Sequence, residues 1–358
     1  MRAGLRAAAS RHLPSGLPAL SSLAAWSPAI VALGFLIYGH RAGLPMASAS
    51  RAVLAVLLTQ LLPGVLVWRA VRPPRGWWLE DVAMGFALGT VLAVAAQTVA
   101  GLTRLPWLSA GIGLAIAAAL LCSPVSRARI LSASTVPLPP WWAPAVSACS
   151  MAAVLPLRDY FRAVPLTWTT GFRAPHNDTY LHLALMAELA HRGPERFPWV
   201  ASEALGYHWF SHAWMAQVSV VSGAGLDETL TRFTPVIMPV VVALSVATAA
   251  LRLSVTLWAG PVAALLTMMG GQLNVFHKAT PGYPITPFSP SLGLAAPVLI
   301  ATVVVLAMRW RGEMPGWGRI VLPALTVAAG GLKGSTVPLV VAGLALALGA
   351  AMIMDRSS

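Results

Sequence analysis

Charged side chains are scarce in this 358-residue chain: Asp, Glu, Lys and Arg make up only 10% of it, against about 25% in soluble domains. Hydrophobic residues make up 57%, and the mean hydropathy is +0.73. An ordinary soluble domain is therefore excluded. Cysteine is scarcer still. Cys122 and Cys149 lie in or beside apolar segments without motif spacing, so they indicate nothing about the redox compartment.

Acidic residues are also few, 11 against 24 Lys and Arg, which gives a net charge of +13. The basic residues lie between apolar segments, where they act as topology signals, so we do not expect nucleic acid as a partner. Most arginines fall on the cytoplasmic side if the N-terminus is cytoplasmic, and we predict that orientation. A cleaved signal peptide, ending near Ala47, Ser48 and Ala49, is the alternative interpretation of the first apolar segment.

What is present in quantity is long apolar runs. Runs of about 17–25 residues are long enough to cross a hydrocarbon core of about 30 Å as helices. The sequence predicts an all-α, polytopic transmembrane helical bundle of about ten spans in the cell membrane, at residues 20–38, 52–71, 82–102, 106–124, 141–157, 233–251, 254–276, 291–308 and 320–354. The last run is too long for one helix. Gly330, Gly331 and Gly334 interrupt it, which predicts two half-length helices or a re-entrant hairpin that brings Lys333 to a membrane face.

Polar residues gather in residues 158–232, between the N-terminal spans of 1–157 and the C-terminal spans of 233–358. We interpret this segment as a large outer-face loop of short amphipathic helices. Seven of the 11 acids and five of the eight histidines lie in it. Loops of this length are uncommon unless they bind, catalyse or are disordered, and the many aromatic residues argue against disorder. The candidate active site is therefore predicted here.

Residues 178–191 are predicted to form a helix that Asp178 starts and Gly193 and Pro194 end. At 100° per residue, Asp178 and His182 fall on the same side as the apolar residues Leu181, Leu185 and Leu189. A carboxylate on a buried face needs a partner or a task, which makes Asp178 and His182 catalytic candidates. The alternative is that Asp178 is a helix cap with His182 as its neighbour.

A second cluster lies in residues 207–214, Tyr-His-Trp-Phe-Ser-His-Ala-Trp. His208 and His212 are four residues apart, so they would face the same way on a helix lying at the membrane interface. Such a pair can ligate a metal or donate hydrogen bonds to a phosphate or a sugar hydroxyl; interfacial packing is the alternative. The metal is unknown from the sequence, and a divalent cation is left open as a cofactor.

The order of these features resembles the C-type superfamily of polytopic membrane glycosyltransferases, as a divergent or truncated member. The resemblance is carried by His176-Asn177-Asp178-Thr179-Tyr180, by Gly193, by Gly206-Tyr207-His208-Trp209 and by Arg232-Phe233-Thr234-Pro235. In that family an acid in an outer loop is the catalytic base, and the sugar comes from a polyprenyl-phosphate donor. The resemblance implies that Asp178 is the base and that Arg232 lies near the donor phosphate.

These residues are consistent with a membrane enzyme that moves a sugar from a polyprenyl-phosphate donor to an acceptor on the outer face. The expected partners are the lipid-linked donor and membrane lipids. Asp178 and His182 are the predicted catalytic residues, and His208, His212, Arg232 and Lys333 are predicted to bind substrate. A snorkelling role is the alternative for Lys333. The competing function is a transporter or a non-catalytic lipid-handling protein, favoured by the interrupted last run and by Gln97 and Gln272 within apolar spans.

Overall fold

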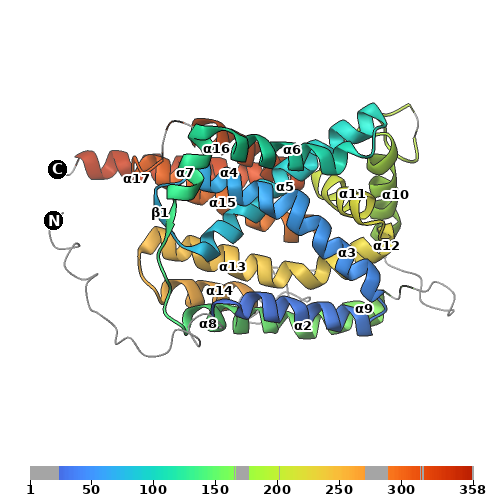
Figure 1. The fold of residues 1–358 in the computed structure, drawn as a ribbon, viewed down its shortest axis with the longest axis horizontal. Coiled ribbons are helices and arrows are strands. Elements are labelled where there is room, and N and C mark those ends of the chain that lie inside the picture. Colours follow the sequence, from blue (N-terminus) through green and yellow to red (C-terminus); the bar gives the residue numbers. More distant parts are fainter. Residues whose placement is uncertain are drawn as a thin grey trace.

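The protein is all-α apart from one short pairing of strands. A computed structural model describes residues 24–164, 166, 177–200, 202–270, 289–314, 316 and 318–356. Most of its helices run roughly along one axis, as Figure 1 shows. Within these residues the named strands are β1 (Arg75–Gly76) and β2 (Ser134–Thr135), which pair in parallel and tie two connections together.

The first half of the chain forms short and long helices in alternation: α2 (Ser27–Arg41), α3 (Met46–Val56), the π-helical η2 (Leu57–Leu61), α4 (Leu62–Val71), α5 (Trp78–Thr103), α6 (Leu108–Cys122), α7 (Pro124–Ser132), α8 (Trp142–Ser150), the 3₁₀ turn η3 (Met151–Ala153) and α9 (Val154–Ala163). The second half forms α10 (Asn177–His191), α11 (Phe210–Ser222), α12 (Leu226–Glu228), the π-helical η4 (Thr229–Phe233), α13 (Thr234–Ser254), α14 (Ala259–Met269), α15 (Pro290–Trp310), α16 (Gly318–Leu332) and α17 (Thr336–Arg356).

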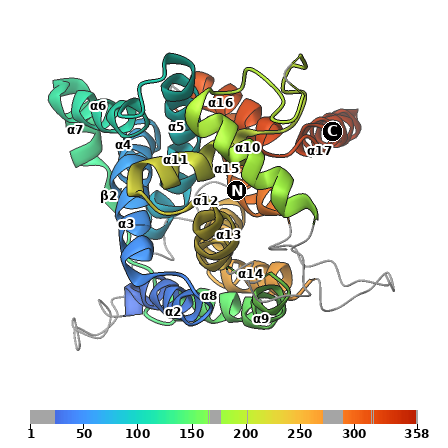
Figure 2. The same cartoon turned by 90° about the vertical axis from the view of Figure 1, so that its right-hand side faces the viewer.

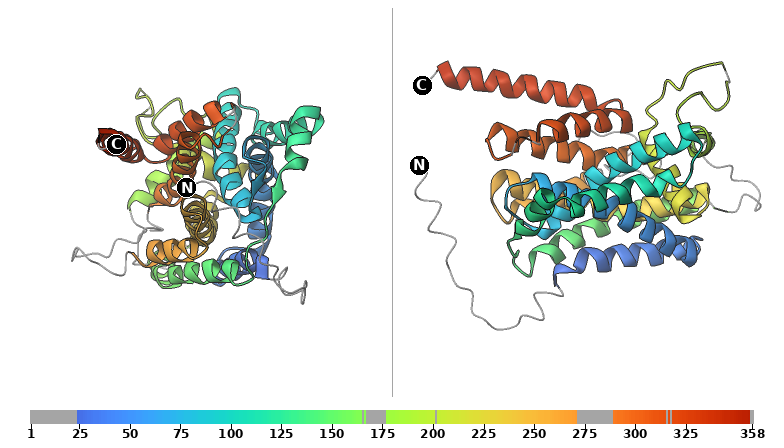
Figure 3. Two further views of the ribbon diagram at one scale, coloured as in Figure 1. Left: turned by 90° about the vertical axis from the view of Figure 1, so that its left-hand side faces the viewer. Right: turned by 45° about the horizontal axis from the view of Figure 1, so that its top comes forward.

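The bundle is built around α13, which packs against α2, α5, α8, α14 and α15 (Figure 2). We call the end that carries α10 and α12 the outer end, and the end that carries β1 and β2 the inner end (Figure 1). The helix α17 stands apart from the rest on one side, and Figure 3 shows it projecting along the edge of the bundle. Its nearest helical neighbours are α15 and α16.

Four helical runs among the described residues are long and apolar enough to cross a membrane: Met46–Val71, Trp78–Thr103, Leu226–Ser254 and Pro290–Trp310. The bent pair α6 and α7, with an angle of 86°, makes a fifth if it is counted as one span. This is fewer than the ten spans predicted. The reason is length, because α2 and α6 have 15 residues each and rise only about 22 Å at ~1.5 Å per residue.

The predicted break in the last run is present, but the pieces differ from the prediction. The helix α16 ends at Leu332 and α17 starts at Thr336, with Lys333 between them. The two helices have 15 and 21 residues, so α17 is longer than a half-length helix. The sequence placed the boundary between the outer-face loop and the C-terminal spans at residues 232 and 233. These residues lie inside the continuous helical run Leu226–Ser254.

Exposed tryptophans mark both ends of the bundle. Trp26, Trp141, Trp258 and Trp310 lie at the inner end, and Trp107 and Trp199 at the outer end; each is at least 36% exposed. Trp141 and Trp258 stack with ring centroids 4.3 Å apart. Tryptophan prefers the two membrane–water interfaces. Together with the long apolar helices, this pattern identifies a membrane protein with the helix ends at the interfaces.

The acids near the inner end are used in buried ion pairs. Asp81, near the start of α5, accepts hydrogen bonds from Nε and Nη2 of Arg72 at 2.6 and 3.2 Å. Glu80, beside it and 1% exposed, pairs with Arg252 near the end of α13. Burying such charges is favourable only when they are paired. These pairs fix α4 and α13 on the same end of α5.

The contact between α4 and α5 depends on glycine. A Cβ added at Gly64 would lie 1.9 Å from the carbonyl oxygen of Gly85, and one added at Gly89 would lie 2.2 Å from the carbonyl oxygen of Gln60. Small residues let membrane helices approach closely enough for backbone packing. The helix α5 therefore touches α4 at Gly64, and η2 at Gln60, through its backbone.

We predict that Gly64→Ala lowers the apparent Tm of the purified protein in detergent by several degrees, because overpacking of this kind costs about 1–3 kcal/mol. Gly34→Ala is the matched control, since an added Cβ in α2 meets nothing within 4 Å. Thermal unfolding of both variants checks this prediction. Equal Tm values for the two variants would contradict it.

A second prediction concerns orientation. In a Cys122→Ser, Cys149→Ser background, a cysteine at the exposed position Ser202 should react with an impermeant thiol reagent added to intact cells. A cysteine at the exposed inner-end position Glu313 should react only after the membrane is opened. Labelling of Glu313→Cys alone in intact cells would invert the topology.

Candidate functional site

The helix α10 supplies the first predicted residues, and it places them differently from the prediction. His182 is 8% exposed and packs inward on the same side as Leu185 and Leu189. Asp178, in the first turn, is exposed. An acid in a first turn is favoured by the helix dipole and does not need burial. The predicted burial is therefore correct for His182 and wrong for Asp178, which is exposed.

The helix α11 does not lie at the interface as predicted. It is enclosed, with Ser211 to Ser219 all buried. It packs against α3, α5, α10, α15 and α16. The aromatic and histidine residues of this segment thus belong to the bundle interior. The prediction assumed that its polar side chains face water, whereas they bond to neighbouring helices.

Two amide side chains hold α11 in place. Trp214 donates from Nε1 to Oε1 of Gln60 at 2.8 Å, and Gln60 donates in turn to Thr90 at 2.9 Å. One turn further along α11, Gln217 donates to the hydroxyl of Thr59 at 2.9 Å and to a backbone carbonyl of α6 at 3.1 Å. A buried amide without partners is costly, so these bonds specify where α11 sits.

A similar bond fixes α10. Gln97, buried in α5, donates from Nε2 to the carbonyl oxygen of Leu189 at 2.9 Å and accepts a bond from the hydroxyl of Ser109 at 2.8 Å. Gly101 lies one turn further along α5, where an added Cβ would come within 2.5 Å of the backbone nitrogen of Gly193. The C-terminal half of α10 is therefore held against α5. Gln97, taken from the sequence as a feature of transporters, has a structural role here, and Gln272 lies outside the described residues.

The two helices meet at a pair of histidines. His182 Nδ1 and His212 Nε2 are 2.8 Å apart, and their ring centroids are 4.9 Å apart. One ring donates and the other accepts, so at least one is neutral. Burial, and then the charges of His182 and His208, lower the pKa of His212 well below its usual 6.5. His212 is therefore neutral at physiological pH.

His208 is not on the same helix as His212, because α11 begins only at Phe210. Tyr207 joins them instead: its ring stacks on His208 at 4.0 Å and meets His212 edge-on at 5.7 Å. The Nε2 atom of His208 is buried without a hydrogen bond within the described part of the chain. Burial, and then the charge of Lys333, lower the pKa of His208. This ring is a neutral group with a nitrogen available to a ligand.

Lys333 and Asp178 lie at the edge of this cluster. A Cβ added at Gly331 in α16 would come within 2.4 Å of the ring of Phe210, so the end of α16 touches the start of α11. Lys333 follows two residues later, and its charge acts on His208. On the other side, burial and then the charge of Asp178 raise the pKa of Tyr207. We call Asp178, His182, Tyr207, His208, His212 and Lys333 the outer cluster.

Arg232 is not part of the outer cluster. It is 1% exposed, and its guanidinium donates to the backbone carbonyls of Ala42, Val164 and Thr231 at 2.8, 2.7 and 3.0 Å. It also lies over the ring of Phe161, 4.9 Å from the centroid. These contacts tie η4 to the turn after α2 and to the end of α9. A structural role replaces the predicted role in phosphate binding.

A metal site is not apparent in the described residues, where no group of three His, Cys, Asp or Glu side chains has a geometry that could hold an ion. His182 and His212 use the facing nitrogens for each other. The outer cluster therefore offers an acid, a cation and neutral imidazoles.

Comparisons of this chain with protein-family models, with curated proteins and with solved structures found no match. The chemistry of the outer cluster thus rests on its own geometry.

Tyr207 is the residue of the cluster that the sequence interpretation missed. It was included only as part of the aromatic segment, although its place directly before His208 in a short link between helices is a signal that it stays close to that ring. The other members of the outer cluster, Asp178, His182, His208, His212 and Lys333, were all candidate residues from the sequence.

The buried histidine pair predicts a pH-dependent stability. Because the folded pKa of His212 is depressed, the unfolded chain binds a proton first as the pH falls, and stability is lost below about pH 6.5. The loss approaches about 1.4 kcal/mol per pH unit for each such group. His212→Gln should flatten the decline of apparent Tm between pH 7.5 and 5. His191→Gln, at an exposed position, is the control and should retain it; a wild type whose Tm is constant over this range would refute the assignment.

Proposed function

We propose that this chain is a membrane glycosyltransferase that moves a sugar from a polyprenyl-phosphate donor to an acceptor at the outer face of the cell membrane. The observation that carries the proposal is the stack of Tyr207 on His208 at the outer end of an apolar bundle, where the charge of Asp178 acts on Tyr207 and that of Lys333 acts on His208. Acid, imidazole and ammonium are the groups that transfer from a phosphate leaving group requires.

In the proposed reaction, the carboxylate of Asp178 takes the proton of the acceptor hydroxyl, and the hydroxyl oxygen forms a bond to the anomeric carbon of the sugar. The bond from that carbon to the phosphate oxygen breaks, and the polyprenyl phosphate leaves with the electron pair. Lys333 stabilises the charge that develops on the phosphate. The exposed position of Asp178 suits an acceptor that arrives from water.

The histidines have supporting roles in this proposal. His208 is neutral and has a nitrogen without a partner among the described residues, so it suits a hydrogen bond to the donor phosphate or to a sugar hydroxyl. His182 is hydrogen-bonded to His212, so we assign it to positioning of α10 against α11, one turn from Asp178. His212 has the same positioning role from α11.

A transfer assay tests the proposal. Membranes with the wild-type chain should move label from radiolabelled polyprenyl-phosphate sugars to an acceptor, and Asp178→Asn should lower the rate by about 10²–10⁴, the usual cost of losing a general base. Asp159→Asn is the matched control, since Asp159 lies exposed in α9 with Arg158 as its partner. Lys333→Ala should lower kcat/KM with an intact fold.

Two outcomes would reject the proposal. Full activity in Asp178→Asn would remove Asp178 as the base. Absence of transfer from every donor would favour the transporter, and substrate-dependent flux in vesicles would then be the measurement.

A further inference from the structure

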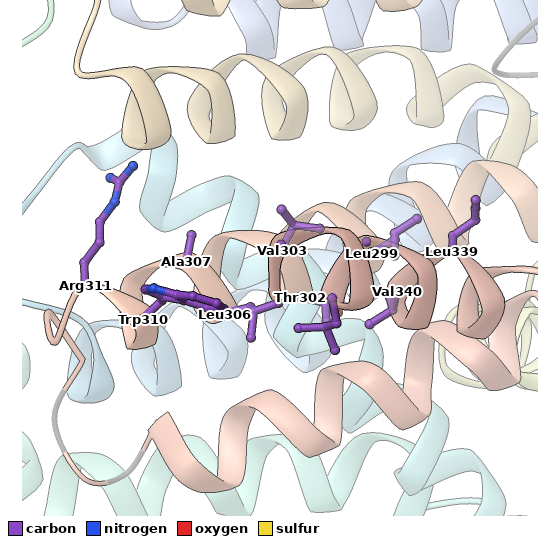
Figure 4. A pocket seen from close by; sticks show the side chains of 12 residues that line it. Leu299, Thr302, Val303, Leu306, Ala307, Trp310, Arg311, Leu339 and Val340 are labelled. Atoms are coloured by element: carbon purple, nitrogen blue, oxygen red, sulfur yellow. The ribbon is translucent and has the colours of Figure 1, made fainter. Parts of the chain in front are cut away.

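An apolar groove runs along the lipid-facing side between α15 and α17, with a volume of about 440 Å³. Figure 4 shows side chains that line it. Leu299, Val303, Leu306 and Trp310 come from α15, and Leu339 and Gly343 from α17. It lies beside α17, the helix that stands apart from the bundle (Figure 3). None of the residues of the outer cluster lines it.

The groove has the length of one lipid chain in one leaflet. From Leu299 to Arg311 the helix rises about 18 Å, at ~1.5 Å per residue. Half of a hydrocarbon core is about 15 Å. Its lining reaches Trp310 and Arg311 at the inner end, where the exposed tryptophans mark an interface. An acyl chain from the leaflet at that end therefore fits between Leu299 and Trp310.

The charge of the groove lining indicates which lipid headgroup suits the site. The lining contains one cation, Arg311, and no acid. Arg311 is exposed, and its Nη2 donates to the carbonyl of Leu253 at 2.8 Å, with Nη1 3.5 Å from that of Arg252. These bonds anchor one side of the guanidinium to the end of α13. A guanidinium has five N–H groups in a fixed fork, so the others suit a phosphate oxygen.

We propose that this groove binds an acyl chain of an anionic glycerophospholipid from the leaflet at the inner end, with the lipid phosphate on Arg311. The site secures α17 to the bundle. It is separate from the outer cluster and does not depend on the proposed glycosyl transfer, because its test needs no catalytic activity.

Two variants of α17 test whether the groove is the lipid site: one fills it and the other leaves it open. Gly343 lines it, and an added Cβ there meets nothing within 4 Å, so Gly343→Leu places a side chain in the space of the acyl chain. Gly349→Leu is the matched control in the same helix, also with open space, but outside the lining. Val303→Trp fills the groove from α15 and repeats the test should Gly343→Leu fail to assemble.

Two further variants test the headgroup. Arg311→Gln keeps an amide donor for the carbonyls at the end of α13 and removes the charge. Arg309→Gln removes the neighbouring exposed charge, which is outside the lining.

The measurements are lipid binding to the purified full chain by native mass spectrometry and apparent Tm in mixed micelles. The probes are phosphatidylglycerol and phosphatidylcholine with identical acyl chains, and inorganic phosphate alone. Wild type should bind phosphatidylglycerol about fivefold more tightly than phosphatidylcholine. Arg311→Gln should lose that preference, and Arg309→Gln should keep it. Gly343→Leu should bind both lipids at least tenfold more weakly than Gly349→Leu, and its Tm should no longer rise with lipid.

Several results would overturn the proposal. Equal lipid binding by Gly343→Leu and Gly349→Leu would exclude the groove as the lipid site. Val303→Trp should then also bind lipid as tightly as the wild type. Equal affinity of the wild type for both lipids would exclude an anionic lipid as the preferred occupant. A Tm rise with inorganic phosphate alone would show that Arg311 binds free phosphate without an acyl chain in the groove, which would also overturn the proposal. A dimer that Gly343→Leu dissociates would identify a second copy of the chain as the occupant.

Discussion

The arrangement of the outer end depends on amide side chains that would be unpaired in an apolar interior. Gln60, Gln97 and Gln217 are each 1% exposed or less, and each bonds to a helix distant in sequence. Where water is absent, an unpaired amide costs several kcal/mol, so one arrangement of helices is favoured over its neighbours. The bonds from Gln97 to Leu189 and from Trp214 to Gln60 hold α10 and α11 to the same set of membrane helices.

The histidine pair follows from those anchors. Leu189 and His182 are seven residues apart on one face of α10, and Trp214 and His212 are close together on α11. Fixing Leu189 and Trp214 therefore leaves the two rings 2.8 Å apart at their nearest nitrogens. Because both histidines are on rigid helices, little conformational entropy is lost when their side chains pair. The pair also keeps the start of α10, with Asp178, where its charge acts on Tyr207.

The sequence predicted what local pattern controls. The helix that starts at Asp178, its inward-facing His182 and the break before Lys333 follow from turn residues and helical periodicity. Hydropathy overestimated helix length, because the apolar runs at 20–38 and 106–124 correspond to the 15-residue helices α2 and α6, and it did not predict the bend after Cys122. It also did not predict the burial of α11, since Ser211, His212 and Gln217 appear solvent-facing until their partners on other helices are known. Arg232 was misplaced for the same reason: its partners are backbone carbonyls, which no side-chain pattern reveals.

The distribution of acids separates the two ends chemically. At the inner end, Glu80 and Asp81 are buried and paired with arginines, so their charge is neutralised within the fold. At the outer end, Asp178 is exposed and its charge acts on Tyr207, while the charge of Lys333 acts on His208. A neutral His212 adds no cation to the outer cluster, whereas a protonated His212 would add one beside that of Lys333. The lowered pKa of His212 therefore favours the contrast between the carboxylate of Asp178 and the ammonium of Lys333 on which the proposed transfer depends.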